Sequence, residues 1–130
     1  MGCDIHGFVE VKINGQWIAF DKLDINRNYL LFAKIAGVRD RSGEVTPIAQ
    51  PRGLPSGLSL VAETCFEIDK EDAHSMTWLS LDEMALVQSW YEAEVVPYHS
   101  IFGYFCGNSW DRENLPKIFE DVRCVIWFDG

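Results

Sequence analysis

Hydrophobic and polar residues alternate near the start of the chain in the pattern that a β-hairpin requires. Residues 8–13 and 16–20 are both rich in strand-forming residues, and Asn14-Gly15 between them is a pair that favours a type I′ turn. Side chains alternate between the two faces of a strand, so the N-terminal segment has one apolar and one mixed face. The apolar face, which we expect to be buried, comprises Cys3, Ile5, Val9 and Val11. The mixed face comprises Asp4, His6, Phe8 and Glu10.

A segment with apolar residues at helical spacing and then a long irregular segment follow the hairpin. Apolar residues recur at helical spacing over residues 27–36, with Asp24 or Asn26 as the expected N-cap and Gly37 as the expected end. Residues 38–60 contain prolines and glycines at short intervals, which disfavours regular structure. A loop of this length in a small domain is usually functional or disordered.

The second half of the chain predicts one more strand, three helices and a final strand. Ser80-Leu81-Asp82-Glu83 has the sequence of a capping box and predicts a helix that runs to about residue 92. Its core-facing residues would be Leu81, Met84, Val87 and Tyr91. The remaining expected elements are a short strand over residues 60–68, short helices over 97–105 and 112–121, and an apolar strand over 122–128.

This order of elements predicts an α+β fold. The 130 residues fit a single compact domain, residues 1–130. We expect the N-terminal β-hairpin and the C-terminal strand to belong to a mainly antiparallel sheet packed with several short helices.

Charge and composition narrow the possible partners. The formal net charge of −9 at pH 7 disfavours direct nucleic-acid binding, and it suits metal cations or a basic partner protein. No apolar run is long enough to span a membrane, and the N-terminus does not resemble a secretion signal. The four cysteines are scattered without a Cys-x-x-Cys pair, so we expect reduced thiols in a cytoplasmic protein.

Asp4 and His6 are the first candidates for chemistry. Two residues apart on a strand, they would offer a carboxylate oxygen and an imidazole nitrogen to one point, which suits zinc, manganese or iron. The same pair also suits a plain carboxylate–imidazole hydrogen bond. For a divalent metal, with zinc the first expectation, His74 is the best third ligand. Cys3 is the alternative ligand, although its place on the apolar face favours a core thiol.

Three arginines are candidates for holding an anion. They are Arg27, at the start of the expected helix, and Arg39 and Arg52, in the irregular segment. A guanidinium matches a carboxylate or a phosphate. If they converged beside Asp4 and His6, a phosphorylated small molecule would be a reasonable ligand. Ordinary pairing with the many acidic residues of the chain is the other interpretation.

Several short motifs occur together along the chain. It opens with Met1-Gly2-Cys3-Asp4-Ile5-His6, and other motifs are Arg27-Asn28-Tyr29, Pro51-Arg52-Gly53-Leu54-Pro55, His74-Ser75 and the terminal Trp127-Phe128-Asp129. In this combination the chain resembles a family of small uncharacterised phage and prophage proteins. Members of that family tend to carry a second histidine where Met76 stands here. The resemblance implies a phage or prophage origin and brings no activity with it.

Three functions are consistent with these observations. The leading hypothesis is a phage-encoded accessory metalloprotein that counters a host defence system, in the manner of an anti-CRISPR inhibitor. It would bind a basic partner protein in the host cytoplasm, with the metal mainly structural and without catalysis. One alternative is a metal-dependent phosphoester hydrolase. The other is a binder that sequesters a nucleotide signal.

Overall fold

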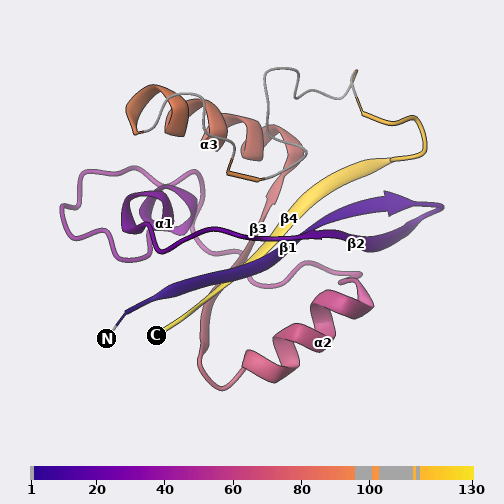
Figure 1. Cartoon of the computed structure of the whole chain (residues 1–130), viewed down its shortest axis with the longest axis horizontal. Coiled ribbons are helices and arrows are strands. Elements are labelled where there is room, and N and C mark those ends of the chain that lie inside the picture. The colour runs from indigo at the N-terminus through magenta and orange to yellow at the C-terminus, as the bar shows by residue number, and fades with distance from the viewer. Residues whose placement is uncertain (1, 96–100, 103–112, 114) are drawn as a thin grey trace.

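Four strands form one antiparallel sheet in the computed structural model of the chain, which describes residues 2–95, 101–102, 113 and 115–130. The strands are β1 (Asp4–Ile13), β2 (Gln16–Lys22), β3 (Ala73–Ser80) and β4 (Asp121–Asp129), in the spatial order β2-β1-β4-β3 (Figure 1). The helices of these described residues are α1 (Tyr29–Ala36), α2 (Leu60–Asp69) and α3 (Leu81–Glu94). This single compact domain confirms the predicted α+β fold.

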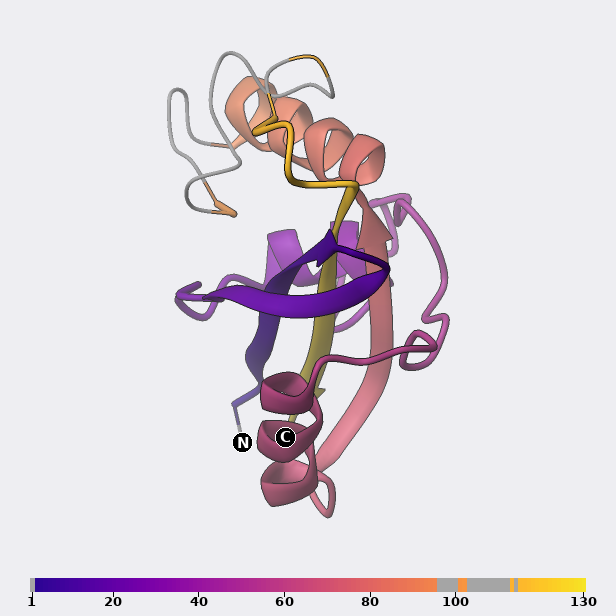
Figure 2. The ribbon, with the colours of Figure 1, turned by 90° about the vertical axis from the view of Figure 1, so that its right-hand side faces the viewer.

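Different helices cover the two faces of the sheet. α1 and α3 pack on one face, where they share the larger core cluster with Phe128 of β4 and with the apolar face of β1. α2 packs on the other face, where Ala62 joins a smaller cluster with Phe8 and Trp127. Figure 1 shows α1 and α3 on one side of the strands and α2 on the other, and Figure 2 gives the view from the side. The predicted burial of Cys3, Ile5, Val9 and Val11 is confirmed.

The turn and two helix ends follow the predicted local signals. Asn14 and Gly15 both have positive φ, 50° and 75°, as a type I′ turn requires. Gly37 ends α1 in the left-handed conformation, and the capping box of Ser80 and Glu83 starts α3. Leu81, Met84, Val87 and Tyr91 are buried as expected.

One predicted cap was wrong. The N-cap of α1 is Asn28, whose side chain accepts a hydrogen bond from the Leu31 N–H, rather than Asp24 or Asn26. Asn28 is the residue directly before the first helical turn, and only from that position does a side chain reach the free N–H groups of the helix.

Three further predictions of secondary structure also need correction. Residues 60–68, expected as a strand, lie in α2, because the Ser59 side chain caps the helix and Ala62 and Phe66 pack on the sheet at helical spacing. The strand β3 was not predicted. Described residues 115–120 form no helix, and the Phe119 N–H bonds the Pro116 carbonyl 2.9 Å away, as in a single turn. The helix expected over 97–105 lies outside the described residues, apart from 101–102.

The first and last strands occupy the middle of the sheet. β1 and β4 pair along their whole length, from Asp4 opposite Asp129 to Lys12 opposite Asp121. The start of β1 and the end of β4 therefore lie side by side, as both ribbon views show. No helix among the described residues has both the length and the apolar character needed to cross a bilayer.

Candidate functional site

Asp4 and His6 share a face of β1, but their side chains have different partners. Both carboxylate oxygens of Asp4 accept hydrogen bonds from Arg27, each 3.0 Å long. These bonds from Arg27 hold the pKa of the Asp4 carboxyl below its ordinary value. His6 Nε2 lies 2.7 Å from Oδ2 of Asp129. A carboxylate–imidazole hydrogen bond is therefore present, with Asp129 rather than Asp4 as the carboxylate.

His74 lies on the opposite face of the sheet from His6. His6 pairs across the ladder with Trp127, and His74 pairs with Phe128, the next residue of β4. Each imidazole stacks on its own aromatic partner, with ring centres 6.4 Å and 6.3 Å apart. Adjacent residues of a strand point to opposite faces, so the two histidines are separated by the sheet.

Cys3 also lies away from Asp4 and His6. Its side chain is buried in the core under α1 and α3, and this burial raises the pKa of its thiol. Its burial agrees with the interpretation of Cys3 as a core thiol.

The observed positions show whether the predicted metal ligands Asp4, His6, His74 and Cys3 can share one ion. Within the part of the chain that the structure describes, no group of three or more His, Cys, Asp or Glu side chains is arranged to hold a metal ion. A shared zinc ion would require Asp4 to leave Arg27 and His6 to leave Asp129, while His74 stayed behind the sheet. The four residues do not fit one metal site as they stand, and metal binding stays a prediction.

The three arginines do not form one anion clamp. Arg27 lies at Asp4, and Arg39 Nη2 donates to the Gly130 carbonyl at 3.1 Å, so both reach the end of the sheet where β1 starts. Arg52 lies farther along the sheet, where Nη1 donates to Glu83 Oε1 at 2.6 Å. Arg27 does border a pocket of about 450 Å³ that Asp4 and His6 also line. Arg27 therefore contacts Asp4 and Arg39 lies beside Cys3, whereas Arg52 lies apart from both of these residues.

A buried ion pair on the α2 face of the sheet was not predicted. Glu10 and Arg123 are cross-strand neighbours, and Arg123 Nε donates to Glu10 Oε1 at 2.7 Å. The remaining Glu10 oxygen accepts the Ser59 N–H at 2.8 Å. Each residue interrupts an apolar strand, Glu10 between Val9 and Val11 and Arg123 between Val122 and Cys124. A charge inside an apolar strand was the sequence signal for this pair.

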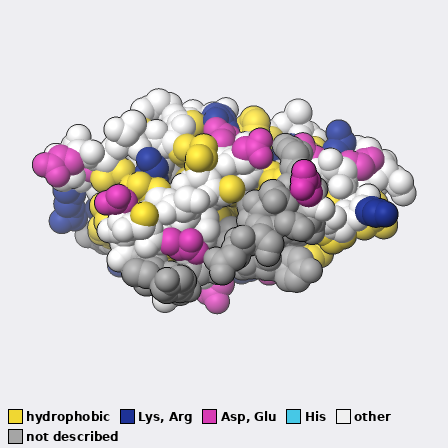
Figure 3. All heavy atoms as spheres, turned by 90° about the horizontal axis from the view of Figure 1, so that it is seen from above, with side chains coloured by type: hydrophobic (Ala, Val, Ile, Leu, Met, Phe, Trp, Pro, Cys, Tyr) yellow, Lys and Arg dark blue, Asp and Glu magenta, His cyan; other side chains and the backbone are white. Residues whose placement is uncertain are grey.

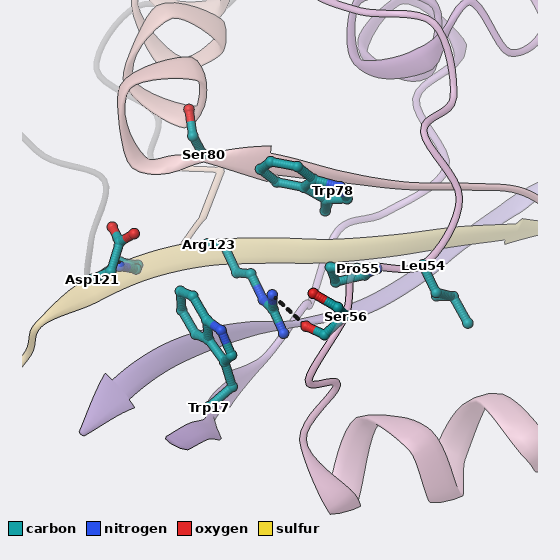
Figure 4. Close-up of a pocket in the computed structure, with 9 residues that line it drawn as sticks. Trp17, Leu54, Pro55, Ser56, Trp78, Ser80, Asp121 and Arg123 are labelled. Carbon is teal, nitrogen blue, oxygen red and sulfur yellow. Dashed lines mark hydrogen bonds between the residues drawn. The ribbon is translucent and has the colours of Figure 1, made fainter. Parts of the chain in front are cut away.

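Arg123 of this pair lines a second pocket. It measures about 420 Å³, and its aromatic walls are Trp17 of β2 and Trp78 of β3 (Figure 4). The loop before α2 closes it with Leu54, Pro55 and Ser56. In Figure 4 the Trp17 indole lies beside the Arg123 guanidinium, and the Trp78 indole lies farther from it, beyond β4 in this view. The sequence did not predict this pocket, because its residues come from four separate segments.

The outer side of α2 carries large apolar side chains in contact with solvent. Leu60 and Ile68 are 78% and 79% exposed, and Val61 is also exposed between them. At about 100° per residue, Leu60, Val61, Thr64 and Ile68 fall within an arc of about 100° on the helix surface. We call Leu60, Val61 and Ile68 the α2 stripe.

Acidic side chains are spread over more than one side of the molecule. Figure 3 shows them recurring across the face that carries α3. Around the α2 stripe, the acids Glu63, Glu67, Asp69, Glu71 and Asp72 are accompanied by a single base, Lys70. Lys70 is itself paired with Glu67 at 2.8 Å. The exposed apolar surface of α2 is therefore bordered by net negative charge.

Comparison of the chain with models of protein families, with curated proteins and with solved structures gives no match. The functional argument therefore depends on the side chains described above. They provide an ion-paired N-terminal end, a pocket between two tryptophans, and an acidic helix with an exposed apolar stripe.

Proposed function

We propose that this protein is a phage-encoded accessory protein that counters a host defence system by binding a basic partner protein in the host cytoplasm. The α2 stripe is the observation that carries the proposal. A helix that keeps two of its largest apolar side chains almost fully in solvent has the form of a helix that inserts into a groove. Exposed apolar surface bordered by polar residues is typical of interaction sites.

The charge around α2 defines the partner. Five acids and one lysine over residues 60–72 give this segment a net charge of −4, out of −9 for the chain. The complementary surface is an apolar groove with lysine or arginine along its rim. Such rims are common on enzymes that handle nucleic acids, and charge complementarity would speed association and select the partner.

The two alternatives depend on other parts of the molecule. A metal-dependent phosphoester hydrolase would use the pocket that Asp4, His6 and Arg27 line, after the rearrangement that a shared ion requires. A nucleotide-signal binder would need cations free to hold phosphates, whereas Arg27 and Arg52 are each engaged by a carboxylate. Both alternatives predict that substitutions in α2 leave function unchanged.

A protection assay tests the proposal. The protein is expressed in cells that carry one of a panel of defined defence systems, and the plating efficiency of a sensitive phage is measured. We expect protection against at least one system. We also expect protection to be lost in the double variant Leu60→Ser, Ile68→Ser, because the two most exposed side chains of the α2 stripe are removed.

Leu86→Ser is the matched control. Leu86 is a similarly exposed leucine on α3, so its loss changes the exposed apolar area without touching the α2 stripe. Thermal unfolding of each variant establishes that the fold is retained. Failure of the parent protein against every system, or full protection by the double variant, would contradict the proposal.

A further inference from the structure

The pocket between Trp17 and Trp78 has the dimensions of a small-molecule site. Its volume of about 420 Å³ lies within the range of roughly 300–1,000 Å³ that ligand pockets occupy. Its walls come from β2, β3 and β4 and from the loop before α2, as Figure 4 shows. It lies apart from the α2 stripe, so it can be tested independently of the proposed function.

The aromatic walls of the pocket are held in place by two arginines. The guanidinium carbon of Arg123 lies 3.9 Å from the centre of the Trp17 ring, and that of Arg52 lies 4.7 Å from the Trp78 ring. Each arginine is fixed in turn by a carboxylate, Arg123 by Glu10 and Arg52 by Glu83. A ligand would therefore meet aromatic surfaces that need little ordering on binding.

Hydrogen-bond donors are more available than acceptors in this pocket. Arg123 donates from Nε to Glu10, from Nη1 to the Ser56 carbonyl and from Nη2 to the Gly57 carbonyl. These bonds use three of its five N–H groups, so each terminal nitrogen keeps one. Within the described residues, neither the Trp17 nor the Trp78 indole N–H has a protein acceptor. A ring with hydrogen-bond acceptors on its edge suits this set of donors.

The charged groups at the pocket also restrict the charge of a ligand that can bind there. The arginines at the pocket are each neutralised by a carboxylate, and Asp121 adds a negative group to the lining. A phosphate would therefore find no uncompensated cation among the described residues that line the pocket, because the Lys12 ammonium lies outside this lining, 5.9 Å from the centre of the Trp17 ring. A cationic ligand would compete with Arg52 and Arg123 for the indole rings that they already contact.

We infer that this pocket binds an uncharged purine nucleoside with two adjacent acceptors, a 6-oxo group and N7, on one edge. The ring would stack against Trp17 and Trp78, as bases stack on aromatic side chains in other proteins. The adjacent acceptors would face the free N–H groups of Arg123, the pairing that arginine makes with a guanine edge. This specifies a nucleoside without its phosphate, which separates it from a nucleotide signal.

Nuclear magnetic resonance of the indole N–H groups tests the inference. The chain has five tryptophans, whose signals are assigned with single Trp→Phe variants. Inosine is the probe, adenosine is the analogue with an amino group in place of the 6-oxo group, and inosine monophosphate adds the phosphate. We expect inosine to shift the Trp17 and Trp78 signals, adenosine to bind more weakly, and the phosphate to give no gain in affinity.

Substitutions identify the site. Trp17→Leu and Trp78→Leu should each weaken inosine binding about tenfold or more. Trp90→Phe is the control, because Trp90 belongs to α3 and packs on the other face of the sheet. This variant should bind inosine as tightly as the parent protein does. A dispersed amide spectrum shows that each variant folds. The inference is overturned if inosine shifts neither signal, if both substitutions leave binding unchanged, or if the monophosphate binds much more tightly.

Discussion

β1 contributes one carboxylate to each of two arginine pairs, and the two pairs differ in their contact with water. Near the middle of the strand, Glu10 is fully buried against Arg123, and the two side chains are 0% and 8% exposed. Near its start, Asp4 pairs with Arg27, and about half of each side chain is exposed. The two carboxylates lie six residues apart on β1, and each accepts a direct charge-assisted hydrogen bond from its arginine.

The difference shows that exposure to solvent, rather than the type of ion pair, determines how much stability is lost when the pair is broken. In water, Asp4 and Arg27 can each be solvated when the partner is lost, so the pair contributes little. Glu10 and Arg123 have no such alternative, and a buried charge without its partner is strongly destabilising. The Arg52–Glu83 pair lies between these extremes, with side chains that are 29% and 21% exposed.

Breaking the buried pair should have the largest effect. Glu10→Gln removes the charge that balances Arg123 and weakens the bond to the Ser59 N–H. We expect the free energy of unfolding to fall by about 3–5 kcal/mol, measured by urea denaturation. Glu44→Gln, in an exposed loop, is the control and should leave it nearly unchanged. A loss below about 1 kcal/mol for Glu10→Gln would mean that Arg123 is not held by this carboxylate.

The intermediate pair should make stability depend on acid. The bonds from Arg52 lower the pKa of Glu83 from 4.5 to about 2. A carboxyl whose pKa is lowered by folding stabilises the protein above its unfolded pKa, and this contribution is lost as the pH falls from 4.5 toward 2. We expect Glu83→Gln to cost about 1–2 kcal/mol at pH 7, after allowance for solvent screening.

The same variant separates charge from helix capping. Glutamine can still complete the capping box with Ser80, so Glu83→Gln mainly removes the negative charge. Urea denaturation of parent and variant from pH 7 to pH 2 should show their difference in stability shrinking below pH 4.5. A difference that stays constant over this range would show that the charge of Glu83 is not responsible.

The exposed pair should give the smallest effect. Asp4→Asn leaves Arg27 free to be solvated, so we expect a change in unfolding free energy close to the error of the measurement. Any difference from the parent should vanish in 1 M salt, at a Debye length of about 3 Å. A difference that persists at high salt would place Asp4 in a structural role beyond the ion pair.

Local signals in the sequence predicted the elements that depend on neighbouring residues. Asn14-Gly15, Gly37 and the Ser80 capping box act within a few residues, and each was confirmed. The strand expected at residues 60–68 was wrong because Val61, Thr64 and Ile68 are β-branched and resemble a strand. Tertiary packing of Ala62 and Phe66 on the sheet nevertheless favours the helix.

The candidate sites were harder to predict because their residues meet only in the folded chain. The sequence placed Asp4 and His6 on one face of a strand, but Asp129 reaches His6 across 123 positions. Glu10 and Arg123 are separated by 113 positions. His74 was expected beside His6, yet the unpredicted strand β3 places it on the other face. Strand register, which no local pattern reveals, decides all of these contacts.

The central place of β4 also has a consequence for folding. β1 and β2 can form their hairpin early, but the second edge of β1 has no partner until β4 has been synthesised. Among the strands that the structure describes, β3 likewise pairs with β4 alone. Until the nine-residue strand β4 arrives, the nascent chain must therefore keep β3 and the second edge of β1 unpaired. Contacts of such long sequence separation slow folding, so this sheet should assemble only after β4 has been synthesised.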